Sequence, residues 1–256
     1  MRLAQILFSQ GFGSRRECIG RILDGQVRIA GAVCEDPDEE FDLTGLVFDV
    51  QGRTWPYTER ALVMLHKPAG YECSMKPRHH PSVMSLLPLP LRVRGLQPVG
   101  RLDEDTTGLL LLTDDGPLIH RLTSPRHHVP KVYDVRCRHT VSAAQLQALR
   151  SGVVLDDDPK PVRAAAAEAE EGSQNLRLTL TEGKYHQVKR MLAAVGNRVD
   201  ALHRSRIGGL ALPQDLRAGD WAWVPDAALV LPPAAGSNEA VSAAPQRRPA
   251  GFSPSS

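Results

Sequence analysis

The sequence predicts an α+β protein with a small N-terminal module and a larger second domain. Leu3, Ile6 and Leu7 recur at the spacing of one helical face. Residues 175–181 alternate apolar and polar side chains, as a half-buried strand does. Helix and strand patterns alternate from residue 61 to about residue 225, and the chain of 256 residues is long enough for one to two domains.

Residues 1–53 predict two short helices followed by a small sheet. The first helix ends near Gly11, and Ser14 provides the N-cap of a second helix that continues to Ile22. The strands of the module are predicted at residues 26–29 and 46–50, with a turn at residues 30–31.

We expect the second helix to expose Arg15, Arg16 and Arg21, which is typical of a docking module. Residues 54–60 are predicted to be a linker between the module and the second domain. Residues 234–256 are rich in Ala, Ser, Pro and Gly and have almost no large apolar side chain, so a disordered tail is predicted there.

The second domain, residues 61–233, is predicted to combine buried strands with amphipathic helices. Ser142 caps one helix and Gly152 ends it. Gly196 ends another helix, whose apolar face is Val188, Met191, Leu192 and Val195. The strands are predicted at residues 61–65, 108–113 and 175–181.

The composition is that of a globular protein. Hydrophobic residues make up 42% and charged residues 23%, which excludes a fibre or a chain disordered throughout. Four cysteines without a C-x-x-C pair argue against a zinc site or a disulfide framework and favour a reducing, cytoplasmic location. The apolar runs are much shorter than the roughly 20 residues of a membrane span, so no membrane partner is expected.

The net charge of +2 conceals a segregation of charge along the chain. Residues 1–28 carry five Arg against two acids, and residues 184–206 carry six Lys or Arg against Asp200 alone. Residues 125–139 are also basic and rich in His. One such patch is as well explained by a solvated helix face, but repeated patches favour a polyanionic partner such as nucleic acid.

Residues 100–116 hold the densest chemical signal, an acidic loop that leads directly into a buried strand. A carboxylate such as Asp103, held beside a rigid strand, suits nucleophilic or acid–base chemistry. On composition alone, a simpler role in which Asp103 and Asp105 cap the loop is favoured. No histidine or further acid stands at ligand spacing, so we predict no metal site.

Residues 182–196 are the second signal. His186, Lys189 and Arg190 share one helix face at spacings i, i+3 and i+4. Such a face meets phosphate or keeps a carboxylate ionised, although an ordinary amphipathic helix explains it equally well. Lys131 and Tyr133 lie on the same side of a predicted strand, where Tyr133 is either a site residue or part of the core.

Residues 100–116 resemble the catalytic motif GRLDxxTxGLLLLTxDG of the pseudouridine synthases. The segments KPAG at 67–70, KVY at 131–133 and the basic motif from Glu182 onward resemble the other motifs of that family. SRRE at 14–17 and GQV at 25–27 resemble the S4 RNA-binding domain. TSPRHH at 123–128, YHQVKRM at 185–191 and LHRSRIGG at 202–209 are similar to the RsuA family, and the likeness covers residues 1 to about 225.

This resemblance implies an S4-like RNA-binding domain at residues 1–53 and a catalytic domain at 61–233, built on a mostly antiparallel mixed sheet flanked by helices. It implies isomerisation of one specific uridine of small-subunit (16S) ribosomal RNA without a cofactor. Asp103 is then the catalytic carboxylate, Lys189 the cation beside it (Arg190 being the alternative), and Tyr133 the ring that stacks on the target base. RNA contacts are implied for Arg101, Arg15, Arg16, Arg21, Lys131, His186, Gln187 and Arg190.

The implied partner is ribosomal RNA, met within a small-subunit assembly intermediate by a monomeric enzyme. Two alternatives to this function stay open. One is the same chemistry on a uridine of large-subunit or transfer RNA. The other is a ribosome-assembly factor that binds RNA without catalysis, against which the presence of Asp103, Tyr133 and Lys189 argues.

Overall fold

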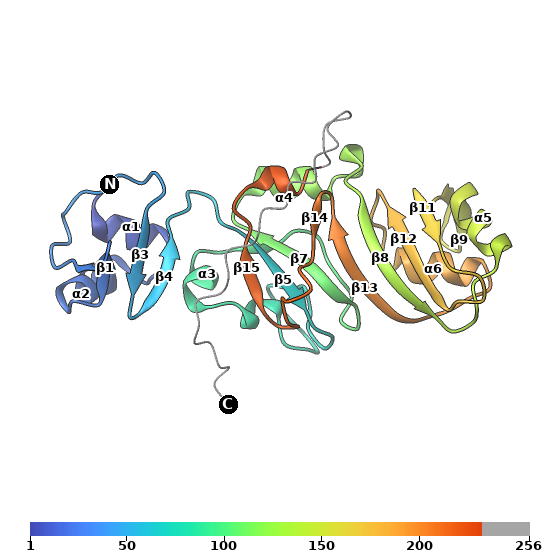
Figure 1. The fold of residues 1–256 in the computed structure, drawn as a ribbon, viewed down its shortest axis with the longest axis horizontal. Helices are drawn as coiled ribbons and strands as arrows, with labels where there is room; N and C mark the ends of the chain where they lie inside the picture. The colour runs from blue at the N-terminus through green and yellow to red at the C-terminus, as the bar shows by residue number, and fades with distance from the viewer. Residues whose placement is uncertain (232–256) are drawn as a thin grey trace.

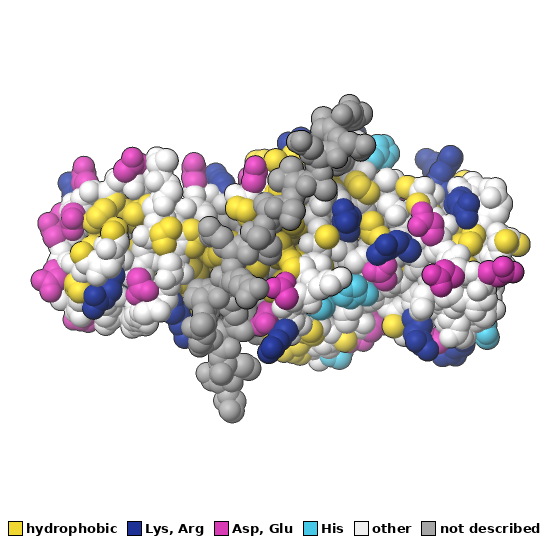
Figure 2. Space-filling view, viewed as in Figure 1, with side chains coloured by type: hydrophobic (Ala, Val, Ile, Leu, Met, Phe, Trp, Pro, Cys, Tyr) yellow, Lys and Arg dark blue, Asp and Glu magenta, His cyan; other side chains and the backbone are white. Residues whose placement is uncertain are grey.

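The computed structural model describes residues 1–231, and the tail predicted at 234–256 lies outside them. The molecule is elongated, with the N-terminal module at one end of its long axis and α5 at the other (Figure 1). On the face seen in Figure 2, Lys and Arg side chains are interspersed with Asp and Glu around β8 and β12. No helix among residues 1–231 is both long and apolar enough to cross a membrane.

The N-terminal module contains the two helices and the small sheet that the sequence predicts. Ser14 begins the second helix with a capping box, in which its backbone N–H donates to Glu17 Oε2 at 2.6 Å. The strands pair in the order β2-β1-β3-β4, all antiparallel. Its elements are α1 (Leu3–Ser9), α2 (Arg15–Leu23), β1 (Val27–Ile29), β2 (Ala32–Val33), β3 (Val47–Val50) and β4 (Arg53–Pro56).

The segment predicted as a linker, residues 54–60, is partly structured. Its first three residues belong to β4, the edge strand of the module's sheet, where Pro56 at the strand end is tolerated. Trp55 explains the difference, because its indole is only 5% exposed and packs edge-on against Phe12. The connection outside the sheet therefore begins at Tyr57.

The second domain is built on a nine-stranded mixed sheet. The main path runs β11-β12-β8-β13-β7-β5-β15, and the only parallel pair in this described sheet joins β13 to β7, which confirms the predicted, mostly antiparallel sheet. Its strands are β5 (Leu62–Lys67), β6 (Gln97–Pro98), β7 (Thr107–Thr113), β8 (Lys131–Cys137), β11 (Ala166–Glu168), β12 (Asn175–Leu180), β13 (Val199–Ile207), β14 (Leu210–Ala211) and β15 (Trp221–Trp223). A separate hairpin pairs β9 (Val153–Leu155) with β10 (Asp158–Val162).

Helices flank this sheet, and the predicted caps are present. Ser142 caps α5 and Gly152 follows its last residue. The strand pattern of 175–180 is confirmed, since Leu176, Leu178 and Leu180 are buried in one core with residues of α5 and α6. The helices are α3 (Leu89–Val93), α4 (Gly116–Thr123), α5 (Ala143–Ser151) and α6 (Gln187–Ala194), with 3-10 turns at Val83–Leu86, Pro125–His127 and Ala227–Leu229.

The module and the second domain share one continuous core. Trp55 of β4 stacks on Trp221 with ring centroids 6.4 Å apart and meets Trp223 edge-on at 6.3 Å. The chain after α1 also approaches α3 closely. A Cβ atom on Gly11 would lie 2.1 Å from the Pro90 carbonyl oxygen, and its φ of +84° favours glycine as well.

Arg94, directly after α3, joins the two parts by hydrogen bonds. Its side chain is 5% exposed, and its Nε donates to Asp114 Oδ2 at 2.5 Å. Nη1 donates to Gln10 Oε1 at 2.6 Å and to Thr58 Oγ1 at 3.0 Å, while Nη2 donates to the carbonyls of Thr58 and Glu59 at 2.7 and 2.8 Å. The guanidinium therefore ties together the module, the connection and the second domain.

We predict that Arg94→Met lowers the free energy of unfolding by about 3–5 kcal/mol, because Asp114, whose side chain is only 15% exposed, is left without its cation. Urea denaturation of the whole chain measures the change. The control is Arg92→Met, which removes an exposed arginine from the adjoining helix α3. Equal effects of the two substitutions would contradict a structural role for the Arg94 contacts.

Candidate active site

A buried lysine fixes the loop that carries Asp103 by hydrogen bonds to backbone carbonyls. Lys67 ends β5, is 0% exposed, and donates from Nζ to the carbonyls of Pro68 (3.0 Å), Glu104 (3.0 Å) and Thr106 (2.8 Å). Burial lowers the pKa of Lys67, although the charges of nearby acids oppose that shift. The loop continues into β7, whose Leu109 is fully buried. These contacts give the Asp103 loop a rigid base.

Two side chains from the start of α6 reach Asp103. His186 Nε2 lies 3.3 Å from Asp103 Oδ1, and Lys189 Nζ lies 3.2 Å from Oδ2. Lys189 also donates to both carboxylate oxygens of Asp105 at 2.8 Å. The Asp103 side chain is 28% exposed, so it is shielded yet open to a ligand. One ammonium thus stands between two carboxylates.

The charges of this cluster reinforce one another. Burial works against the charged form of Lys189, but the hydrogen bonds and charges of Asp105 and Asp103 outweigh it and raise the pKa of the ammonium. Burial likewise works against ionised Asp105, and Lys189 outweighs it, so the pKa of that carboxyl is lowered. The ammonium and the Asp105 carboxylate therefore both carry charge at neutral pH.

A small pocket of about 70 Å³ opens beside Asp103. Among the residues 1–231, no group of three or more His, Cys, Asp or Glu side chains is placed to hold a metal ion. Tyr133 is half-buried and packs against two hydrophobic clusters, the one that contains Trp221 and the one that contains Leu178. It therefore lies at the border between the core and the site. The predicted site residues that line the pocket are Arg101, Asp103, Tyr133, His186, Gln187 and Lys189.

Three predicted RNA contacts have other partners in the structure. Lys131 directs its Nζ to the carbonyls of Val129 (2.9 Å) and Leu122 (3.4 Å). Arg190 pairs with Asp157 in the tight turn between β9 and β10. Gln187 is 4% exposed and donates to Glu182 Oε1 at 2.8 Å. Each partner lies outside the helix or strand that carries the residue, so helix and strand periodicity does not reveal it.

The arginines of α2 lie on the N-terminal module and do not line the pocket. Arg15 and Arg16 are exposed as predicted. The prediction for Arg21 is wrong, since its side chain is half-buried. Its Nε donates to the Phe12 carbonyl at 3.3 Å, which holds the end of α1 against α2.

The sequence analysis missed a basic loop beside the site, residues 72–82. Glu72 shapes it by accepting the backbone N–H groups of Arg78, His79 and His80 at 3.1, 2.8 and 3.0 Å, and these bonds lower the pKa of the Glu72 carboxyl. His80 Nε2 lies 3.5 Å from Glu104 Oε2, next to Asp103. The basic side chains clustered in KPRHH at 76–80 are the feature of the sequence that could have predicted this loop.

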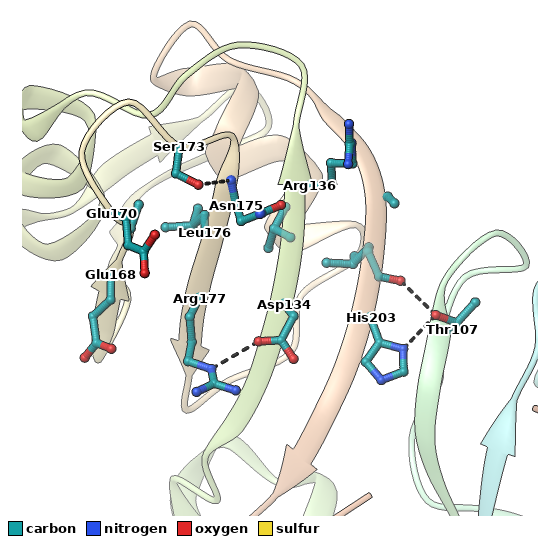
Figure 3. Close-up of a pocket in the computed structure, with 14 residues that line it drawn as sticks. Thr107, Asp134, Arg136, Glu168, Glu170, Ser173, Asn175, Leu176, Arg177 and His203 are labelled. Carbon is teal, nitrogen blue, oxygen red and sulfur yellow. Dashed lines mark hydrogen bonds and ion pairs between the residues drawn. The ribbon is translucent and has the colours of Figure 1, made fainter. Parts of the chain in front are cut away.

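A larger hollow of about 690 Å³ lies on the opposite face of the sheet (Figure 3). Side chains alternate along β8, so Tyr133 faces the Asp103 pocket while Asp134 lines this hollow. Asp134 pairs with Arg177 at 3.1 Å, and His203 Nδ1 is 2.8 Å from Thr107 Oγ1. These groups satisfy each other, and none of the predicted site residues lies here. The Asp103 pocket is therefore the candidate active site.

The arrangement around Asp103 is suited to chemistry on a planar base. A carboxylate paired with an ammonium provides a shielded negative charge, and a tyrosine ring beside it provides a surface for stacking. Together with an N-terminal module that exposes two arginines on a helix, these features are typical of a protein that acts on nucleic acid.

The comparison with known families agrees with this class. The profile of RNA pseudouridylate synthases matches residues 61–194, and the S4 domain profile matches residues 1–44. The chain belongs to the RNA pseudouridylate synthase family.

Individual relatives are similar over most of the chain. The ribosomal small subunit pseudouridine synthase A of Yersinia pestis is 42% identical over 228 residues, covering 86% of this chain and 93% of that protein. The uncharacterized RNA pseudouridine synthase YtzG of Bacillus subtilis is 38% identical over 224 residues, covering 86% and 93%. A crystal structure of a pseudouridylate synthase superposes with a TM-score of 0.63 at 33% identity, covering 90% of this chain and 98% of that one.

Lys131 gives the folded protein a pH-dependent stability. Burial first, and the charge of Arg204 second, lower the pKa of its ammonium from 10.5 to about 8. Between these values the unfolded chain binds more protons than the folded one, so the free energy of unfolding rises with pH. We predict that wild type gains stability relative to Lys131→Met between about pH 8 and about pH 10.5.

Urea denaturation at each pH measures this difference, and Lys160→Met, at an exposed lysine of β10, is the control that should follow wild type. A constant difference between wild type and Lys131→Met across the range would contradict the lowered pKa.

Proposed function

We propose that this enzyme isomerises one specific uridine of small-subunit (16S) ribosomal RNA to pseudouridine, with Asp103 as the catalytic carboxylate. The observation that carries the proposal is the Asp103–Lys189 pair at 3.2 Å, placed in a pocket with Tyr133. The similarity to a relative named ribosomal small subunit pseudouridine synthase A, over 86% of the chain, supports the choice of RNA.

The reaction breaks the bond between N1 of uracil and C1′ of ribose and forms a bond between C5 and C1′. The C5 proton is lost and N1 gains a proton, so the product is an isomer and the reaction needs no redox partner. The base must first leave its stack, which costs a few kcal/mol. RNA contacts outside the pocket offset this cost.

Each side chain of the pocket has a part in this scheme. Lys189 places its ammonium 3.2 Å from the Asp103 carboxylate, so a cation compensates that negative charge while the bound base excludes water. Tyr133 stacks on the target base inside the pocket. Arg101, exposed at the start of the loop, fills the place that the flipped nucleotide leaves in the RNA.

The module at residues 1–53, completed by β4, docks the RNA outside the pocket. Arg15 and Arg16 contact phosphates there, and the basic loop at residues 72–82 contacts the strand near the target. The enzyme acts as a monomer in the cytoplasm on an assembly intermediate of the small subunit.

We predict that Asp103→Asn lowers the single-turnover rate of isomerisation by about 100-fold or more, while RNA affinity is retained, because only the charge of the carboxylate is removed. Pseudouridine formed in a small-subunit RNA transcript measures the rate, and filter binding measures affinity. Glu104→Gln, which neutralises the next carboxylate of the loop, should stay active. Residual activity of Asp103→Asn above about a tenth of wild type would overturn the assignment.

Lys189→Met should lower kcat by about tenfold or more and change the Kd for RNA by less than about threefold, because its ammonium stabilises Asp103 rather than a phosphate. Arg190→Met is the matched control, since that guanidinium pairs with Asp157 instead. If Lys189→Met weakens binding and leaves kcat unchanged, Lys189 is a phosphate contact and not the partner of the catalytic carboxylate.

A further inference from the structure

Tyr185 is a largely exposed aromatic side chain at the edge of the candidate active site. Tyr185 is 75% exposed, which is the highest value among the exposed large hydrophobic residues of 1–231. An apolar ring left in water has a surface that association with another ring would remove from solvent. Nothing in the mechanism above uses this ring.

The orientation of Tyr185 is set by its neighbour. The ring stacks on His186 with centroids 3.8 Å apart and an interplanar angle of 20°. His186 has the left-handed backbone conformation, with φ +48° and ψ +32°, which is rare for a residue other than glycine. Such strained residues cluster at functional sites. Here the turn presents two stacked rings, the inner of which lies 3.3 Å from Asp103 Oδ1.

The position of Tyr185 relative to the pocket indicates which part of a bound RNA its ring contacts. The pocket is lined by Lys184 and by His186, but not by Tyr185 between them. A base inside the pocket therefore contacts Tyr133 and the inner ring of the stack, whereas Tyr185 is available to a group just outside the pocket. In a bound RNA, that group belongs to a nucleotide beside the flipped uridine.

Tyr185 lies on a turn that ion pairs hold in place. Its own carbonyl accepts a hydrogen bond from Arg190 Nη1 at 3.1 Å, while Arg190 pairs with Asp157 and Lys184 pairs with Asp158. An exposed aromatic ring on such a fixed turn is a feature with which proteins hold single-stranded nucleic acid, since the ring stacks on a base.

We propose that Tyr185 is a stacking platform for an unpaired nucleobase next to the target uridine. The inference rests on the proposed function, because it needs a flipped uridine in the pocket. Flipping removes the stacking partner of the adjacent base, and the Tyr185 ring replaces that partner. Tyr185 thus contributes to RNA affinity and to the preference for a single-stranded target.

The test uses the whole chain and a short single-stranded RNA with one uridine between purines, either intact or with an abasic nucleotide on one side of the uridine. Fluorescence anisotropy gives the Kd. Tyr185→Ala is expected to weaken binding of the intact RNA on the order of tenfold, whereas Tyr185→Phe, which keeps the ring, binds as wild type does. Val154→Ala, at another exposed apolar residue, is the matched control.

An abasic nucleotide on the stacking side should weaken wild type by a similar factor and leave Tyr185→Ala unaffected, because the contact is already absent. The slope of log Kd against log salt concentration should be unchanged in Tyr185→Ala, since stacking releases no counterions. Equal affinities of Tyr185→Ala and wild type would overturn the inference. The inference would also be overturned if the abasic nucleotide weakened binding equally in both proteins. A smaller slope of log Kd against log salt concentration in Tyr185→Ala would overturn it as well.

The same preparations are assayed for isomerisation of a small-subunit RNA transcript. Suppose that wild type isomerises the transcript, but that the abasic nucleotide weakens binding equally in wild type and Tyr185→Ala. This result overturns the inference about Tyr185 and leaves the proposed function intact. Wild type that fails to isomerise the transcript overturns the proposed function, while the oligonucleotide binding still decides whether Tyr185 stacks.

Discussion

The buried ammonium of Lys67 holds the active-site loop in place through backbone carbonyls alone. A charge with 0% exposure is costly unless polar groups surround it, and the three carbonyl oxygens at 2.8–3.0 Å supply that environment. Two of them belong to the loop, that of Glu104 between Asp103 and Asp105 and that of Thr106 directly after Asp105. The loop therefore shares the rigidity of β5, and Lys189 approaches from α6 to a carboxylate whose place is already defined.

Strand β7 links this site to the N-terminal module. The Asp103 loop enters one end of the strand, and Asp114 follows the other end, where it accepts hydrogen bonds from Arg94 and from the Ala61 backbone N–H at 2.8 Å. Arg94 also bonds to Gln10 of the module. Residues 100–116 thus carry Asp103 at one end of β7 and fix the module through Asp114 at the other, so the distance between α2 and the pocket is set by the fold.

Local signals in the sequence predicted much of the fold, and long-range partners account for what they missed. Ser142, Gly152 and the alternation at 175–180 act through neighbours in the chain, so pattern alone located their elements. The spacing predicted that Lys189 and Arg190 share one helix face, but it could not show which of the two contacts Asp103. Asp157, which lies in a distant hairpin, turns Arg190 away from the site. Long-range contacts also place the first three residues of the predicted linker in β4, because Trp55 packs against Trp221, more than a hundred positions later.

We propose that the carboxylate of Asp103, held by this scaffold, makes pseudouridine at one site of small-subunit ribosomal RNA. The most direct measurement maps pseudouridine by carbodiimide labelling and primer extension in ribosomal and transfer RNA from three strains: wild type, a deletion, and a strain whose gene encodes Asp103→Asn. The account predicts that one small-subunit site is lost in both altered strains. A site lost only from large-subunit or transfer RNA, or a site that Asp103→Asn still modifies, would contradict it.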